Sequence, residues 1–154
     1  MAADMTGAAL SLSVGMHRGA ASELEGGARV PRVDTVEKLA KVLHVSPCLL
    51  AFGIEQRCEL VVGSLSAGLS GRLLLLRQER GLSRRELGRL SGTSDNFVQM
   101  TETGATIPNI AKLEQLAKAL HVSVCWLAYG VGNRELPTSR GSRPDVRPAA
   151  DPTA

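Results

Sequence analysis

The spacing of apolar and polar residues over positions 81–104 predicts two short helices joined by a tight turn. Ser83 is a favourable N-cap, because its hydroxyl can accept hydrogen bonds from free backbone N–H groups. Glu86 follows it at the spacing of a capping box, which marks the start of the first helix. Leu87 and Leu90 then recur three positions apart, and we expect them to form an apolar stripe on this helix.

The turn and the second helix have equally clear signals. Gly92 predicts the turn, since a residue without Cβ adopts a positive φ at little cost. Ser94 is a second N-cap, and the helix that it begins runs over residues 95–103 before Gly104, a residue type common just beyond helix ends. The pattern is helix, turn, helix.

This pattern belongs to an internal repeat. Residues 44–53 read HVSPCLLAFG, and residues 121–130 read HVSVCWLAYG, 77 positions later. The same offset aligns residues 4–53 with residues 81–130 without a gap and gives 18 identities in 50 positions. The sequence therefore indicates a tandem duplication, with a helix at residues 17–24 in the first copy as the counterpart of the helix at residues 95–103.

The second copy has one predicted helix that the first copy lacks. This helix covers residues 69–80, and one of its faces carries Leu69, Leu73 and Leu76. Its loss from the first copy leaves apolar side chains such as Leu10, Leu39 and Leu43 without a cover. Leu74 and Leu75 lie on the other side of the extra helix, and we expect them to pack against the truncated copy or a dimer partner.

Composition divides the chain into four parts: a truncated domain at residues 4–53, a linker at 54–68 that could instead form a strand, a complete five-helix domain at 69–130, and a disordered, proline- and arginine-rich tail at 131–154. Aromatic residues make up only 3% of the chain, which argues against modules that stack single-stranded bases. The formal charge of +3 permits nucleic-acid binding without requiring it. The alternative for the tail is an arm that tracks phosphates.

The candidate chemistry of the chain is sparse. Cys48, Cys58 and Cys125 are odd in number and widely spaced, so we expect no disulfide framework and a cytoplasmic, soluble protein without a membrane segment. His44 with Cys48, and His121 with Cys125, have a possible zinc spacing, but a helix-ending histidine and a small apolar cysteine explain each pair better. No nucleophile elbow, phosphate loop or paired carboxylate pattern occurs, and we expect neither an enzyme nor a cofactor.

Residues 69–130 resemble the Cro-repressor-type, or Xre, family of helix-turn-helix proteins, and residues 4–53 resemble the last four helices of the same domain. The resemblance rests on RGLS at residues 80–83, the ETG at 102–104, Pro108, and LAKALHVSVCWLAYG at 116–130. It implies an all-α fold of two tandem lambda-repressor-like domains, the first truncated. It also implies a partly buried salt bridge between Arg77 and Glu102.

The resemblance further assigns a DNA-binding surface to the second copy. Arg84 takes the position of a phosphate contact, with Arg85 and Ser94 beside it. The residues that it turns toward the bases, or next to them, are Asp95, Asn96, Gln99 and Met100. Phe97 either touches a thymine methyl group or packs on the domain surface. Asn96 suits adenine. Asp95 is repelled by phosphates, although its carboxylate can accept from cytosine, and Met100 offers only apolar contact.

The first copy is less suited than the second to contact DNA bases. Gly7 stands where Arg84 stands, and the base-facing positions become Arg18, Gly19 and Glu23, of which Arg18 alone suits guanine. Two functions follow from the resemblance: a sequence-specific transcriptional regulator, a repressor, that binds double-stranded DNA as a homodimer, or a protein-binding derivative, such as an antirepressor or inhibitor, with weak or no DNA binding.

Overall fold

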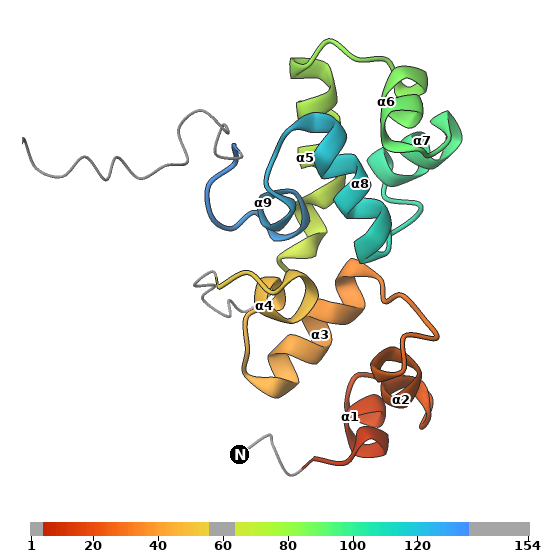
Figure 1. The fold of residues 1–154 in the computed structure, drawn as a ribbon, viewed down its shortest axis with the longest axis vertical. Helices are drawn as coiled ribbons and strands as arrows, with labels where there is room; N and C mark the ends of the chain where they lie inside the picture. The colour runs from red at the N-terminus through yellow and green to blue at the C-terminus, as the bar shows by residue number, and fades with distance from the viewer. Residues whose placement is uncertain (1–4, 56–63, 136–154) are drawn as a thin grey trace, which may run out of the picture.

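The computed structural model describes residues 5–55 and 64–135, and every regular element in this part is a helix (Figure 1). Asp4, residues 56–63 of the predicted linker with Cys58 and the apolar run 60–62, and the predicted tail from residue 136 on lie outside the described residues. Within the described ranges, no helix is both long and apolar enough to cross a membrane.

The helices follow the predicted repeat. The first copy consists of α1 (Gly7–Ser13), α2 (Ala20–Glu25), α3 (Val33–Leu43) and α4 (Pro47–Phe52). A short 3-10 helix, η2 (Ser66–Gly68), leads into the second copy, which consists of α5 (Leu69–Glu79), α6 (Arg84–Ser91), α7 (Asp95–Glu102), α8 (Ile110–Leu120) and α9 (Val124–Tyr129). Helix α5 is the extra helix, so the all-α tandem fold with a truncated first copy is confirmed.

The helix ends have the caps that the sequence predicts. The Ser83 hydroxyl accepts from the Glu86 N–H at 3.1 Å, and the Glu86 carboxylate accepts from the Ser83 N–H at 2.7 Å, which completes the capping box. Gly92 ends α6 with a φ of 69°. His44 and His121 end α3 and α8 in the same left-handed conformation, with φ values of 55° and 54°. Each histidine is thus a C-cap, as the sequence predicts.

One core serves most of the second copy and reaches into the first. Helix α5 buries the predicted face in it, and the facing helices supply most of the rest: Leu69, Leu73, Leu76, Leu87, Val98, Leu113, Leu116, Leu120 and Leu127. Val33 and Cys48 of the first copy belong to the same cluster. One prediction was wrong in this region, because Leu90, which was expected to share an apolar stripe with Leu87, is 53% exposed. Leu75 is 47% exposed and Leu74 is half-buried, and their packing against the truncated copy or a dimer partner stays a prediction.

The two copies are joined by a reciprocal backbone pairing. The Val33 N–H donates to the Pro108 carbonyl at 3.1 Å, and the Ile110 N–H donates to the Pro31 carbonyl at 3.0 Å. Val33 and Ile110 are equivalent residues of the repeat, and so are Pro31 and Pro108, because each pair is 77 positions apart. The two bonds are therefore the same contact made in both directions, and the two copies meet about a local two-fold axis. Residues 32 and 109 pair antiparallel at its centre.

A single side chain reinforces this junction from the second copy. The Tyr129 hydroxyl donates to the Val33 carbonyl at 3.0 Å, in a buried position, and burial raises the pKa of the phenol well above its ordinary value. Phe52 occupies the equivalent place in the first copy and has no hydroxyl to return the bond. The junction is therefore two-fold in its backbone and asymmetric in its side chains.

Glu37, which is buried on α3, ties the first copy to the segment that enters α5. Its carboxylate accepts from the Leu65 N–H at 2.5 Å, the Ser66 N–H at 3.1 Å and the Ser66 hydroxyl at 2.6 Å, and also from the Ser64 hydroxyl. Burial alone raises the pKa of Glu37, but these hydrogen bonds together bring the pKa below its usual value. Residues 64–66 of the predicted linker are therefore held against the first copy.

We expect Glu37→Gln to lower the free energy of unfolding at pH 7 by about 1–3 kcal/mol, because it removes a charged acceptor of several hydrogen bonds. Since the folded-state pKa is lowered, the stabilisation is present above the unfolded pKa of about 4.3 and is lost as the pH falls through the folded pKa. Urea unfolding at pH 7 and in acid should show the difference shrinking. Glu114→Gln, at the equivalent exposed position of α8, should change stability by less than about 0.5 kcal/mol.

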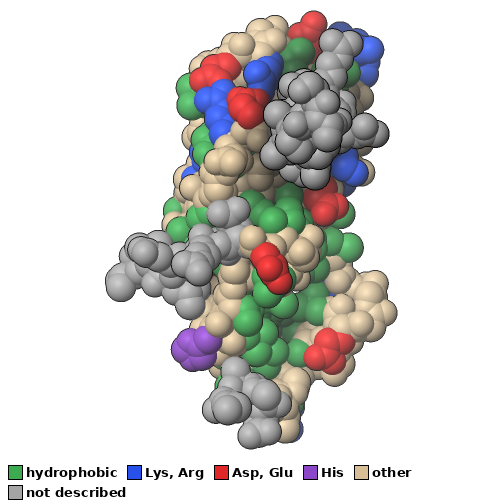
Figure 2. Space-filling model, turned by 60° about the vertical axis from the view of Figure 1, so that its left-hand side comes forward, with side chains coloured by type: hydrophobic (Ala, Val, Ile, Leu, Met, Phe, Trp, Pro, Cys, Tyr) green, Lys and Arg blue, Asp and Glu red, His purple; other side chains and the backbone are tan. Residues whose placement is uncertain are grey.

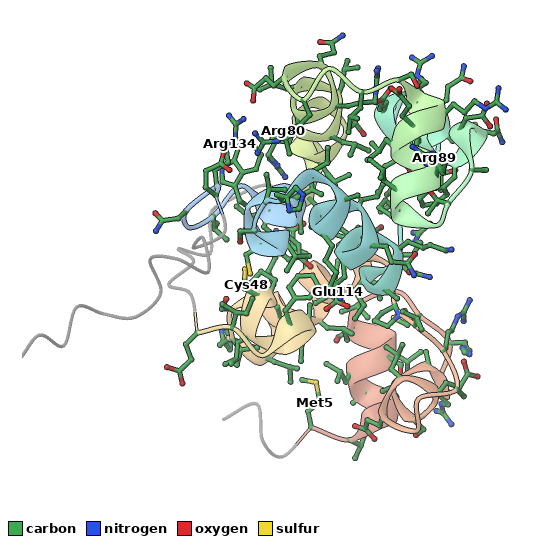
Figure 3. All side chains as sticks on the ribbon, turned by 45° about the horizontal axis from the view of Figure 1, so that its top comes forward. Met5, Cys48, Arg80, Arg89, Glu114 and Arg134 are labelled. Carbon is green, nitrogen blue, oxygen red and sulfur yellow. The ribbon has the colours of Figure 1, made fainter. Side chains whose placement is uncertain are left out.

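The chain remains ordered beyond Gly130, where the tail was expected to begin. The Ser123 N–H donates to the Arg134 carbonyl at 2.8 Å, and the Arg134 guanidinium lies over the Trp126 ring, 5.4 Å from its centroid. Arg134 also pairs with Glu79 at the end of α5, near the labelled Arg80 in Figure 3. The described part of the second copy therefore extends to residue 135.

Candidate nucleic-acid interface

The turn between α6 and α7 depends on a close approach that only glycine permits. A Cβ added to Gly88 would lie 2.9 Å from the Ser94 carbonyl carbon and 3.0 Å from the Asp95 nitrogen, both of which are backbone atoms. Gly88 therefore lets the start of α7 pack directly on α6. Gly88 was not among the predicted residues, although a glycine within a helical pattern is itself a signal of close packing.

Helix α7 buries one face and exposes the other. Val98 and Thr101 are fully buried, whereas Asn96, Gln99 and Met100 are exposed. Asp95 is also exposed, and its carboxylate accepts from the Asn96 N–H at 2.9 Å. The exposed side of α7 is thus made of the residues that the resemblance turns toward the bases.

Two other candidates on this helix have structural contacts. Phe97 is half-buried and packs against the core, which fits the second of its two predicted roles. The Ser94 hydroxyl accepts from the Phe97 N–H at 3.0 Å and so caps the helix. The cap uses the Ser94 oxygen as an acceptor, so the expected phosphate contact of this residue would use its O–H as the donor.

Glu102, at the end of α7, holds two arginines. Its side chain is only 2% exposed, and Arg77 of α5 donates to it from Nε and Nη2. Arg77 also donates to the Leu82 carbonyl at 2.9 Å, which fixes the loop between α5 and α6. The geometry is that of the ion pair expected from the resemblance, and it joins α5 to α7 and to the loop before α6.

Arg84 is the second arginine on Glu102, a contact that was not predicted from the sequence. Its Nε donates to the carboxylate at 2.9 Å, yet the side chain remains 44% exposed at the start of α6. A carboxylate behind a guanidinium fixes its orientation, so the exposed edge of Arg84 is presented to solvent in a set direction. Arg85, next to it, is exposed as well.

The first copy builds this region differently. Helix α2 begins at Ala20, not at residue 17 as predicted, so Arg18 lies in the turn before the helix and not on it. The cause is local: His17 replaces the capping serine found at Ser94, and the Ser11 hydroxyl instead accepts from the Ala21 N–H at 2.9 Å. Glu23 lies on α2 with His17 3.2 Å from its carboxylate. The helix is two residues shorter at the end where bases would be read.

The helix-turn-helix units of the two copies lie on the same side of the molecule. In Figure 1, α2 and α7 are both on the right, α3 and α8 lie between them, and the two-fold junction is in the middle. Figure 3 shows the same arrangement from a second direction, with Arg89 of α6 among the side chains on this side. One chain therefore carries both units on one side of the molecule, one toward each end, with the junction between them.

Cys48 and Cys125 are buried in α4 and α9. Across the two described ranges, no group of three or more His, Cys, Asp or Glu side chains is arranged to hold a metal ion.

Comparison with protein families gives one clear result. The family model described as helix-turn-helix matches residues 1–50 and again residues 73–127, together more than half of the chain. No curated protein and no solved structure matches the chain. The first matched segment covers most of the first copy of the repeat, and the second covers most of the second copy. Each copy has its own helix-turn-helix motif. The chain belongs to the Cro-repressor-type, or Xre, helix-turn-helix family and carries the domain in two tandem copies.

Proposed function

We propose that the protein is a sequence-specific transcriptional regulator that binds double-stranded DNA and acts as a repressor by occupying an operator. The observation that carries this proposal is the exposed face of α7, with Asn96 and Gln99 free to reach base edges while Val98 and Thr101 anchor the helix in the core. Family membership supports the DNA-binding part of the proposal.

In this proposal, α7 enters the major groove and α6 lies across the phosphate backbone. Arg84, oriented by Glu102, donates its exposed N–H groups to a phosphate, and Arg85 assists. Asn96 forms paired hydrogen bonds with an adenine, and Gln99 lies one turn along the same face. Asp95 accepts from a cytosine amino group, and Met100 makes only apolar contact.

The junction between the two copies affects how many chains are needed to bind one DNA site. A homodimer was expected from the family, but α2 and α7 already lie on one side of a single chain. We therefore propose that one chain offers both reading units, with the second copy providing most of the affinity. Arg18, in the turn before α2, then contributes a phosphate or guanine contact at the weaker half of an asymmetric site.

The protein-binding derivative remains the second candidate. It is favoured by Glu23, which is on the face of α2 where a basic or neutral side chain would suit DNA. A carboxylate there is repelled by phosphates and costs binding energy at the first copy.

The test measures DNA binding against salt concentration for the wild-type protein, Arg84→Ala and Asn96→Ala. Duplexes are taken from the region upstream of the gene and from a random pool that is enriched by selection. Arg84→Ala should weaken binding to all duplexes and reduce the slope of log K against log salt by about 1. Asn96→Ala should cost about 1–3 kcal/mol on the selected sequence and little on random DNA.

Lys118→Ala is the matched control, because Lys118 is exposed in the last turn of α8, outside the helix-turn-helix unit. It should leave both the affinity and the slope unchanged. Thermal melting of each variant checks that Arg84→Ala, which also loses its bond to Glu102, is folded. If no duplex is enriched and the slopes of all variants agree, the DNA-binding proposal fails and the protein-binding candidate takes its place.

A further inference from the structure

The first copy has an open apolar groove between the helix pair α1 and α2 and the helix pair α3 and α4. It encloses about 340 Å³, and Ile110 of the second copy forms part of its wall. Figure 2 shows hydrophobic side chains gathered over this lower half of the molecule. Six side chains from the first copy make up most of its apolar lining: Leu10, Leu24, Val36, Leu39, Leu43 and Leu50.

The second copy shows what fills the same place there. The residues 77 positions further along are all fully buried: Leu87, Thr101, Leu113, Leu116, Leu120 and Leu127. The five leucines among them belong to one core cluster with Leu69, Leu73 and Leu76 of α5, and Thr101 lies on α7, which packs against α5. The groove of the first copy is therefore equivalent to the place that α5 fills in the second copy, and none of the helices described for the first copy occupies it.

Two glycine pairs show the same difference at the edges of the groove. A Cβ on Gly130 would lie 3.1 Å from the Arg72 guanidinium of α5, and a Cβ on Gly104 would lie 3.6 Å from the Ser70 hydroxyl. At the equivalent Gly53 and Gly27, nothing lies within 4 Å. Both the end of α4 and the end of α2 thus face open space where their counterparts touch a helix.

The polar rim defines which helix would fit. In the second copy, Arg77 pairs with the buried Glu102, and Arg72 donates to the carbonyls of Leu127 and Ala128 at 3.0 and 2.8 Å. The first copy keeps the carboxylate as Glu25, which is exposed at the wall of the groove, and it keeps the end of α4 at Leu50 and Ala51. The groove thus combines an apolar floor with acceptors for basic side chains.

We propose that this groove binds an amphipathic helix of another polypeptide, one that carries leucines spaced like Leu69, Leu73 and Leu76 and an arginine placed like Arg77 to pair with Glu25. Apolar side chains at this spacing give a helix its affinity for a groove, and the arginine fixes its direction. The chain's own residues 137–154 do not fit, because they contain four prolines and no leucine.

The probe is a synthetic peptide of residues 66–80, labelled with a fluorophore. A covalent staple between positions 71 and 75, which are both exposed on α5, holds it helical, because so short a helix is marginal in water. We expect saturable one-to-one binding to the full-length protein in the micromolar range. A peptide with Leu73→Glu should not bind, since its charge would enter the apolar floor.

A charge exchange locates the peptide. Glu25→Arg in the protein should weaken binding of the wild-type peptide about tenfold, and a peptide with Arg77→Glu should recover it. Leu50→Glu, a change at a side chain 42% exposed in the free protein, should abolish binding without unfolding. Circular dichroism verifies the fold of both variants.

Three results would overturn the proposal. The first is the absence of saturable binding. The second is binding that ignores Glu25→Arg and Leu50→Glu, which would mean that the peptide displaces α5 from the second copy. The third is a wild-type protein that sediments as a dimer while Leu50→Glu sediments as a monomer, since a second copy would then occupy the groove.

Discussion

Glu102→Ala should lower the free energy of unfolding by about 3 kcal/mol, one of the two largest effects that we expect from a single change in this protein. The carboxylate is almost completely buried and is bonded to both Arg77 and Arg84. Its removal leaves the guanidinium of Arg77, itself largely buried, without its charged partner, and an unpaired buried charge costs several kcal/mol.

Glu25→Ala is the matched control, because Glu25 is the same residue of the repeat in the copy that lacks α5. It should change stability by less than about 0.5 kcal/mol. Urea unfolding followed by circular dichroism measures both variants. Equal losses for the two would contradict the view that the ion pair with Arg77 stabilises the second copy.

Leu73→Ala should lower the free energy of unfolding by about 2–5 kcal/mol. Leu73 is fully buried at the centre of the core, and alanine would leave a cavity below α5 in addition to removing apolar contacts. Leu75→Ala, two residues away on the exposed side of the same helix, should cost less than about 0.5 kcal/mol.

Denaturant unfolding of the two leucine variants separates burial from helix propensity, because the chemical change is the same in both. A small effect at Leu73 would mean that the second copy is not held together by α5. A large effect at Leu75 would instead indicate a partner on the outer side of that helix.

Much of the fold could be predicted from the sequence because its signals are local. The capping box at Ser83 and Glu86 and the turn glycine Gly92 each depend on residues within four positions of one another. The repeat then transferred these assignments from one copy to the other. The helix ends at His44 and His121 were predicted for the same reason, although a left-handed histidine is less common than a left-handed glycine.

The errors arose where a prediction needed a three-dimensional neighbour. Leu90 has the spacing of a core residue, but no helix covers it, and periodicity alone does not say where a core ends. The start of α2 was predicted from its counterpart, while the loss of one capping serine moved it to Ala20. A repeat carries over a helix more reliably than it carries over the residue at which the helix begins.

The residue types of the candidate site could be predicted from the sequence, but the contacts that these residues make could not. The exposure of Asn96, Gln99 and Met100 follows from their place on α7 once Val98 is buried. The bond from Arg84 to Glu102 joins residues 18 positions apart on different helices, and no local pattern encodes it. The pairing of Val33 with Pro108 is more distant still, and it required the fold itself to bring the two loops together.

The backbone pairing between the two copies has a consequence for the protein at low concentration. Two separate subunits part on dilution, because their association depends on how often they meet. Here residues 31–33 and 108–110 belong to one chain, so their effective concentration is fixed by the polypeptide that links them. The two helix-turn-helix units should stay paired even when a compartment holds a single molecule.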